Sequence, residues 1–201
     1  MNPNTMKEQI EASYAWVTRH KTPSEDNVMA ATRDIFRARL DRVYKELTRP
    51  PRSEAEGALL TAIAGEIGNN CFDHNLGQWR DEMGCWFIWG IDGATAWIIL
   101  ADRGQGVLSS LGRVDPSIRT DQQALDAAFS RIISGRSPEK RGNGLKFVKR
   151  IVNGNSKRGL FFSSGKGRIV LGSLGPSAEA NVPQPSSATA VFGTWALLLG
   201  E

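Results

Sequence analysis

The stretch GEIGNNCFDHN places Glu66, Asn70, Asp73 and His74 close together. Glu66, Asn70 and Asp73 follow the spacing i, i+4, i+7, so they share one face of a predicted helix. The neighbouring apolar stripe, which we expect to be buried, consists of Leu60, Ile63, Ile67 and Cys71. This polar face therefore borders the core. It forms either half of an active site or a solvated helix face, and the segment alone leaves both open.

A second group of chemically capable residues stands where a predicted strand ends. The run TAWIILAD ends in Asp102 and is followed by Gly104 and Gly106. A carboxylate in this place can accept a hydrogen bond from an exocyclic amine, and glycine allows the backbone to approach a flat ring closely. An ordinary strand-to-loop turn is the alternative interpretation.

A third group precedes a predicted helix in RGNGLKFVKRIV. Gly142 and Gly144 lead into this helix, and Lys140 and Arg141 stand beside them. Free backbone N–H groups and the helix dipole favour an anion such as phosphate at such a start. The sequence therefore predicts an anion site here.

The elements that must hold these groups follow from local patterns. Ser53 and Glu56 form a capping box, which predicts a helix from residue 53 to about 74. CWFIWGID and TAWIILAD predict two strands joined by a short Gly-Ala turn. The connection 107–141 has no strand pattern and contains one short helix around 124–133, so we expect a mobile lid with little to bury. SSGKGR fails the P-loop pattern and predicts a hairpin turn instead.

Two further segments flank this central part. Residues 1–52 predict an N-terminal helical arm, a hairpin of two helices whose second member is capped by Ser24 and stopped by TRPPR. The arm either packs on the rest of the chain or forms a dimerisation or partner-binding surface. Residues 172–190 are rich in Pro, Ser and Ala, which predicts a flexible insert between the last strands.

Composition limits the kind of protein further. The chain has 201 residues, a formal net charge of +4 and two cysteines, Cys71 and Cys85. No apolar run approaches the roughly 20 residues that cross a bilayer, and the first residues carry no secretory signal, so we expect a cytoplasmic protein without a membrane association. The mild positive charge gives no reason to expect nucleic acid. Two isolated cysteines predict buried, reduced thiols and no zinc site.

The order of the three motifs resembles the GHKL ATPases, which include DNA gyrase, the ninety-kilodalton heat-shock chaperones, histidine kinases and MutL proteins. The shared pattern is E-x-x-x-N on a helix, D-x-G-x-G after a strand, a variable lid and G-x-G-L at a helix start. It covers about residues 55 to 200, and FGTWALLLGE looks like the last strand of that family. The resemblance implies a Bergerat-type ATP-binding domain over 53–201. This fold is a two-layer α/β sandwich with a mixed, mostly antiparallel sheet covered on one face by helices.

The resemblance also implies roles for individual residues. Asn70 would ligate Mg²⁺, and a neutral oxygen suits an ion held mainly by phosphates and water. Glu66 would be the base that orients an attacking water or hydroxyl, and Asp102 would bind the adenine amino group. The ATP-binding residues implied in this way are Asn70, Asp73, Asp102, Gly104, Gly106, Lys140, Arg141, Gly142, Asn143, Gly144, Leu145 and Thr194.

The branch of the family is indicated by EIGNNCFDH. Its acid before His74 is similar to the E-x-x-x-N-x-x-E-H motif of small anti-sigma-factor serine kinases. His20 stands before Thr22-Pro23 and fits the phosphoacceptor box of histidine kinases poorly. The resemblance thus implies a Mg-ATP-dependent protein kinase or ATPase that acts on a small protein partner in bacterial signalling. The alternatives are a binding switch without turnover and the catalytic domain of a histidine kinase.

Overall fold

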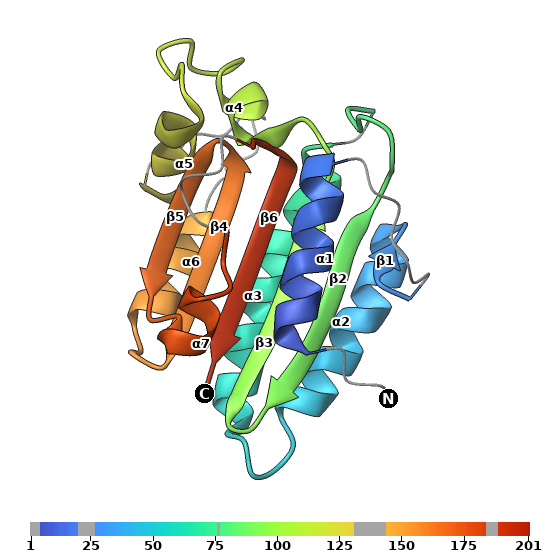
Figure 1. Cartoon of the computed structure of the whole chain (residues 1–201), viewed down its shortest axis with the longest axis vertical. Coiled ribbons are helices and arrows are strands. Elements are labelled where there is room, and N and C mark those ends of the chain that lie inside the picture. The colour runs from blue at the N-terminus through green and yellow to red at the C-terminus, as the bar shows by residue number, and fades with distance from the viewer. Residues whose placement is uncertain (1–4, 20–26, 76, 131–143, 184–188) are drawn as a thin grey trace.

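The computed structural model describes residues 5–19, 27–75, 77–130, 144–183 and 189–201. Six strands form one sheet in the order β1-β2-β3-β6-β4-β5 (Figure 1), and every neighbouring pair is antiparallel. The strands are β1 (Met29–Ala30), β2 (Cys85–Asp92), β3 (Thr95–Asp102), β4 (Arg158–Gly165), β5 (Gly167–Gly172) and β6 (Val191–Gly200). The α/β class is confirmed, whereas the expectation of a mixed sheet is wrong, because the described strands form antiparallel pairs throughout.

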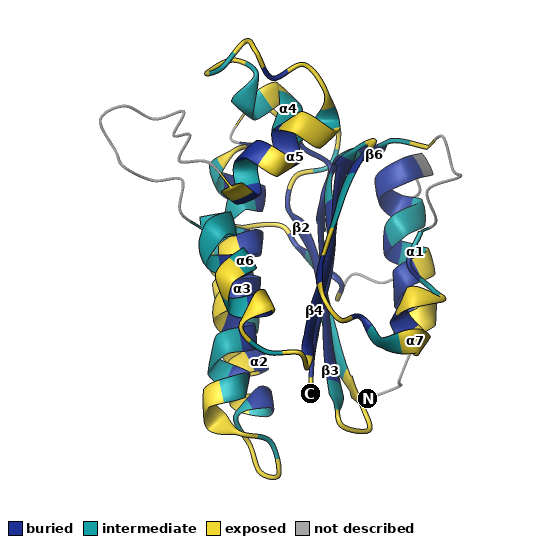
Figure 2. Cartoon of the chain, turned by 90° about the vertical axis from the view of Figure 1, so that its left-hand side faces the viewer, coloured by how far each residue is buried: buried dark blue, intermediate teal, exposed yellow. Residues whose placement is uncertain are grey.

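The main core lies between the sheet and one layer of helices. This layer contains α2 (Arg33–Leu47), α3 (Glu54–Asp73), α5 (Asp121–Ser130) and α6 (Gly144–Asn153). The predicted apolar stripe of α3 is confirmed, because Leu60, Ile63, Ile67 and Cys71 are all buried in this core. Figure 2 shows the helices of this layer on one side of the sheet, with their buried faces turned toward it.

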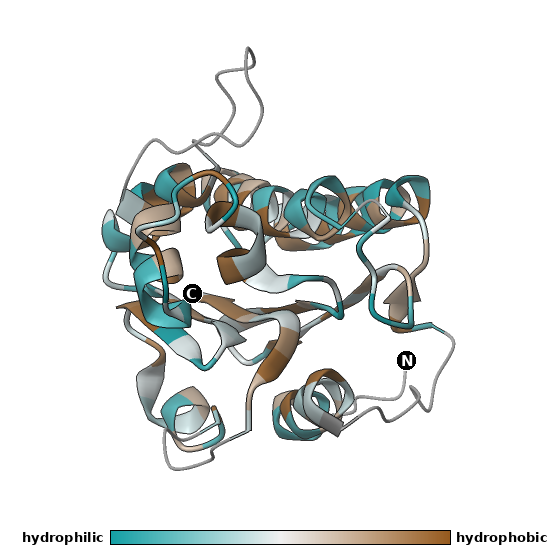
Figure 3. Ribbon diagram, turned by 90° about the horizontal axis from the view of Figure 1, so that it is seen from above, coloured by the Kyte–Doolittle hydropathy of each residue, from teal (hydrophilic) through white to brown (hydrophobic). Residues whose placement is uncertain are grey.

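The opposite face of the sheet is covered as well. Helices α1 (Met6–Arg19) and α7 (Gly175–Glu179) pack there against a second core that includes Trp86, Trp97 and Trp195. The protein thus has three layers, helix, sheet and helix (Figures 2 and 3), and the expected two-layer sandwich is wrong. The physical reason is visible in β3, whose residues from Ala96 to Asp102 are all buried; a strand with one solvated face would alternate apolar and polar residues.

The N-terminal segment does not form the expected hairpin of two helices. Helix α1 lies on the second face and α2 on the first, and between them β1 pairs with β2 at the edge of the sheet. Helix α2 begins at Arg33, with Thr32 as its N-cap, rather than after Ser24. Glycines on α3 let α2 lie close: a Cβ at Gly68 would come within 2.1 Å of the Phe36 ring.

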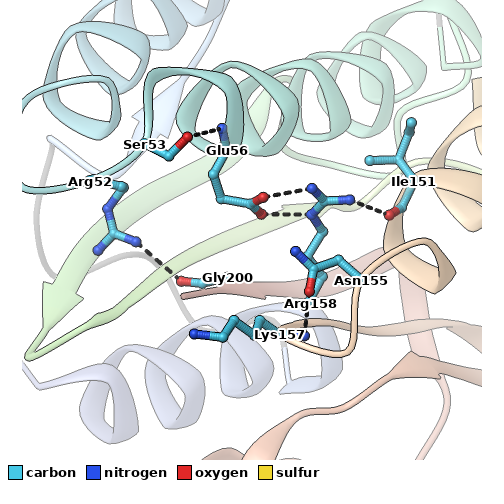
Figure 4. Close-up of polar contacts among 8 residues, drawn as sticks. All are labelled: Arg52, Ser53, Glu56, Ile151, Asn155, Lys157, Arg158 and Gly200. Carbon is cyan, nitrogen blue, oxygen red and sulfur yellow. Dashed lines mark hydrogen bonds and ion pairs between the residues drawn. The ribbon is translucent and has the colours of Figure 1, made fainter.

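The predicted start of α3 is confirmed only in part. Ser53 caps the helix and accepts a hydrogen bond from the Glu56 backbone N–H, but the Glu56 side chain does not return to Ser53. It binds the Arg158 guanidinium instead, with Nε–Oε1 and Nη2–Oε2 distances of 2.6 Å (Figure 4). Arg158 Nη1 also donates to the carbonyl oxygen of Ile151 at 2.7 Å. This pair joins α3, α6 and β4 at the end of the sheet where β4 begins.

Two other expectations concern the second half of the chain. The hairpin at SSGKGR is confirmed, since β4 and β5 pair with Ser164 opposite Gly167. The loop expected over 172–190 is wrong for its described beginning, where α7 forms and Leu174, Ala178 and Val182 are buried against the sheet. Within the described ranges, no helix is long and apolar enough to span a bilayer.

Candidate functional site

Asp102 lies at the end of β3 in a group of hydrogen bonds that we call the Asp102 cluster: Asp102, Asn75, Gly104 and Thr194. Its side chain is only 2% exposed. Oδ1 accepts from the Gly104 N–H and from Asn75 Nδ2, each at 2.8 Å. Oδ2 accepts from the Thr194 hydroxyl. A carboxylate has about four acceptor positions, and these donors occupy three of them.

Three separate elements bring this cluster together. Thr194 stands directly opposite Asp102 because β3 and β6 pair in that register. Asn75 follows the C-terminal end of α3, and its Nδ2 also donates to the Cys71 carbonyl at 2.8 Å. The Gln105 N–H donates to Asn75 Oδ1 at 3.0 Å. Sequence motifs single out Asp102 and Thr194 but not Asn75, whose partner Asp102 is 27 residues further along the chain.

Burial and hydrogen bonding act on the Asp102 carboxyl in opposite directions. Burial raises its pKa above the ordinary value, since an apolar environment disfavours the charge. The hydrogen bonds from Thr194, Gly104 and Asn75 favour the carboxylate and oppose that rise, as does the Cys71 thiol. A thiol is a weak donor, which an N–H group can replace. The charge is thus held by specific donors rather than by solvent.

The glycines around this cluster are required by close approach. A Cβ on Gly104 would lie 1.9 Å from the Asn75 side chain, so the absence of a side chain at Gly104 makes room for that amide. Gly106 has a φ of +79°, a conformation that side-chain-bearing residues rarely adopt. Gly193, which no sequence motif indicates, has a φ of +74°, and a Cβ there would lie 2.4 Å from Asp102 Oδ1.

A Gly193→Ala variant is expected to destabilise the protein and to disturb the Asp102 cluster. The left-handed conformation alone costs an alanine roughly 1–2 kcal/mol, and the contact with Asp102 adds to that cost. Gly93→Ala is the matched control, because Gly93 has a φ of +60° and a Cβ there would meet nothing within 4 Å. Urea unfolding should show a larger loss for Gly193→Ala. Equal losses would mean that the Asp102 contact is not restrictive.

Ser164 ties the next helix to the same end of the sheet. Its hydroxyl donates to the Gly193 carbonyl at 2.7 Å and accepts from the Val107 N–H at 3.0 Å. Val107 belongs to α4 (Gly106–Leu111), a helix that the sequence does not predict. The start of the expected lid is therefore fixed to the ends of β4 and β6.

The described part of the lid, 107–130, is more packed than the sequence suggests. Ala124, Ala127 and Ile118 form a small core with the apolar side chains of α4. Asp121, at the start of α5, accepts a hydrogen bond from the Lys166 N–H in the β4–β5 hairpin at 2.9 Å. Outside the expected 124–133 helix, Ile118 is the only buried residue of the described lid, and residues 131–141 lie outside the described ranges.

The polar residues of α3 lie next to two different helices, α6 and α2. Glu66 is exposed and lies beside the start of α6, where a Cβ on Gly144 would come within 2.4 Å of Glu66 Oε2. Asn70 is half-buried one turn further along. Asp73 forms an ion pair with Arg33 of α2 and so is bound on the α2 side. The structure thus joins Glu66 to the glycine motif and gives Asp73 a different partner.

The glycine motif itself is described only from Gly144. Helix α6 begins there, as predicted, and Leu145 packs against the main core. Lys140, Arg141, Gly142 and Asn143 lie outside the described residues, as does His20. The anion site predicted for this segment stays a prediction.

Both cysteines are buried, as expected. Cys71 is 1% exposed and Cys85 is fully buried. The neighbouring Cys85 side chain and burial together raise the pKa of the Cys71 thiol well above its usual value. The Cys71 thiol is therefore poorly reactive.

The comparisons with known proteins leave the family open. No model of a known protein family matches this sequence, and no curated protein matches it. Within the described residues, no group of three or more His, Cys, Asp or Glu side chains could hold a metal ion.

Proposed function

We propose that this chain is a Mg-ATP-binding regulatory protein of the GHKL type. The observation that carries the proposal is the Asp102 cluster, in which a buried carboxylate at a strand end accepts from three donors and from the weakly donating Cys71 thiol. The exocyclic amine of adenine is a stronger donor than this thiol and would replace it on the Asp102 carboxylate.

The phosphates would lie toward Glu66 and the start of α6. Support comes from the contact of Gly144 with Glu66 and from Asn70, one turn along α3. When bound, Mg-ATP would supply a phosphoryl group whose charge the ion neutralises. Asn70 would contribute a neutral oxygen ligand, and Glu66 would orient the acceptor hydroxyl or water. Lys140, Arg141, Gly142, Asn143, Gly144 and Leu145 are the residues proposed to contact the phosphates.

Two outcomes of ATP binding fit this arrangement. In the first, the protein transfers phosphate to a serine or threonine of a small protein partner, or to water, with Glu66 as base. In the second, occupancy alone changes affinity for a partner protein, with no turnover. The exposed Glu66 carboxylate beside the glycine motif favours the first.

Two substitutions separate binding from chemistry. Asn70→Ala is expected to abolish the Mg²⁺-dependent part of ATP affinity, because it removes an oxygen ligand. Glu66→Gln is expected to leave affinity nearly unchanged and to lower phosphate release or transfer by about 10²-fold or more, the usual contribution of a general base. Calorimetry with and without Mg²⁺ measures the first effect, and γ-labelled ATP with the purified protein measures the second.

Glu54→Gln is the control for the second measurement, because Glu54 is exposed at the other end of α3. If Glu66→Gln turns over ATP at the wild-type rate, Glu66 is not the base. If the wild type binds ATP but releases and transfers no phosphate, the binding switch is the better description.

A further inference from the structure

Two consecutive residues at the end of β3 serve opposite faces of the sheet. Asp102 is hydrogen-bonded to Asn75 after the end of α3, and Arg103 is hydrogen-bonded to the Trp16 carbonyl of α1, which covers the other face. Arg103 is 2% exposed, which is rare for an arginine without a structural or functional partner. One peptide unit joins the two residues, so the backbone that positions Asp102 also positions Arg103.

Arg103 holds the C-terminal end of α1 with several interactions. Its Nη1 donates to the Trp16 carbonyl at 3.1 Å, and its Cζ lies 5.6 Å from the centroid of the Trp16 ring. Nη2 forms an ion pair with Asp81 at 2.6 Å. Trp16 is in the last turn of α1, where a cation interacts favourably with the helix dipole and the terminal carbonyls.

The same arginine reaches the strand on the other side of the cluster. Its Cζ lies 5.8 Å from the centroid of Phe192, the residue before Gly193. The Arg103 carbonyl accepts from the Arg80 N–H at 3.1 Å, and the Arg80 guanidinium stacks on Phe192 at 4.5 Å. Arg103 follows Asp102 directly in the chain and contacts both α1 and the β6 residue before Gly193.

The rest of the α1 layer is incompletely satisfied. Among the described residues, several polar atoms in it are buried without a hydrogen-bond partner, and each such group weakens the docking of α1. They are Gln9 Oε1, Tyr14 OH, Trp86 Nε1, Trp97 Nε1 and Ser163 Oγ. Arg103 Nε is another such atom, so the anchoring of α1 by Arg103 rests on Nη1, Nη2 and the ring contact.

We propose that Arg103 is a positioning residue for the Asp102 cluster and that it couples the docking of α1 to the binding of an adenine nucleotide. This inference rests on the proposed function. Coupling is reciprocal, so a nucleotide bound at Asp102 strengthens the docking of α1, and α1 docked on Arg103 strengthens nucleotide binding. The docking of α1 on its face of the sheet thereby depends on whether a nucleotide is bound on the other face.

The test compares wild type, Arg103→Met, Arg103→Lys and Arg80→Met in titrations with Mg-ATP and Mg-ADP. Methionine keeps the apolar stem and removes the guanidinium, so we expect affinity to fall roughly fivefold or more, the lower end of typical coupling. Lysine should restore part of the loss because it keeps the charge. Arg80→Met should bind as the wild type does, since Arg80 is exposed and its guanidinium stacks on the same Phe192 ring.

Hydrogen exchange of α1 separates positioning from general destabilisation. Mg-ATP should increase the protection of the α1 amides in the wild type and in Arg80→Met but not in Arg103→Met. If Arg103→Met does not fold, Asp81→Asn takes its place. Asp81 is the more exposed member of the ion pair, and its substitution removes that ion pair from Arg103. The ATP-dependent protection of α1 should then also decrease.

The outcomes distinguish this inference from the proposed function. Wild-type protein that fails to bind ATP would overturn both. Wild-type protein that binds ATP, together with unchanged affinity and unchanged α1 protection in Arg103→Met or its substitute, would overturn the coupling and leave ATP binding intact.

Discussion

An Asp102→Asn variant is expected to keep its fold and to lose most of its affinity for ATP. Asparagine has the same shape, and its oxygen can still accept from Gly104 and Asn75. The Thr194 hydroxyl can accept from the new amide instead of donating to it. The amide N–H would then face the adenine amine, donor against donor, which costs about 1–3 kcal/mol, or roughly ten- to a hundredfold in affinity. Calorimetric titration with Mg-ATP measures this loss.

Asp92→Asn is the matched control, because Asp92 is exposed at the β2–β3 hairpin, the opposite end of β3 from Asp102. It should bind ATP as the wild type does. Wild-type affinity in Asp102→Asn, with a native circular dichroism spectrum, would show that Asp102 does not recognise the nucleotide.

The difference in unfolding free energy between Asp102→Asn and the wild type should depend on pH. Because burial raises the pKa of Asp102, the folded protein holds this proton more tightly than the unfolded chain does. The resulting contribution to stability is present below the ordinary aspartate pKa of about 3.9 and is lost as the pH rises through the raised value. Asparagine cannot ionise, so the unfolding free energy of Asp102→Asn should improve relative to the wild type from about pH 4 upward. A difference that is constant with pH would contradict the raised pKa.

A Glu56→Gln variant should cause the largest loss of stability. The Glu56 and Arg158 side chains are only 11% and 8% exposed, and two parallel hydrogen bonds join them (Figure 4). Removing the carboxylate leaves the buried guanidinium charge without its counterion, which costs about 3–5 kcal/mol. This is a large share of the roughly 5–15 kcal/mol that stabilises a typical domain. The midpoint of urea unfolding measures it.

Glu54→Gln is the control for this measurement, since Glu54 stands in the same first turn of α3 but is exposed. It should change stability by about 0.5 kcal/mol or less. The double variant Glu56→Leu/Arg158→Met should recover much of the loss, because it removes both charges. If Glu56→Gln is no less stable than Glu54→Gln, the pair contributes nothing to stability.

Local patterns in the sequence predict much of the fold. CWFIWGID and TAWIILAD coincide with β2 and β3, because each is an unbroken apolar run and a glycine turn separates them. Ser53 marks the start of α3, since a capping interaction involves only neighbouring residues. These elements need no information from distant parts of the chain.

Features that depend on distant pairing do not follow from local patterns. The strand order places β6 between β3 and β4, and only then do Asp102, Thr194 and Ser164 meet at one end of the sheet. Arg103 and Arg158 resemble surface cations in the sequence, although each is buried against an acid far away in the chain. The absence of polar alternation in β3 is the one local signal that helices cover both faces.

ATP binding is the central claim, and the most direct test is a calorimetric titration of the wild-type protein with Mg-ATP and with Mg-GTP. Guanine presents an acceptor oxygen where adenine presents its amino group, so it would face Asp102 acceptor against acceptor. We expect saturable binding of ATP and an affinity for GTP that is roughly ten- to a hundredfold weaker. Equal affinities for the two nucleotides, or no binding of ATP, would contradict the account.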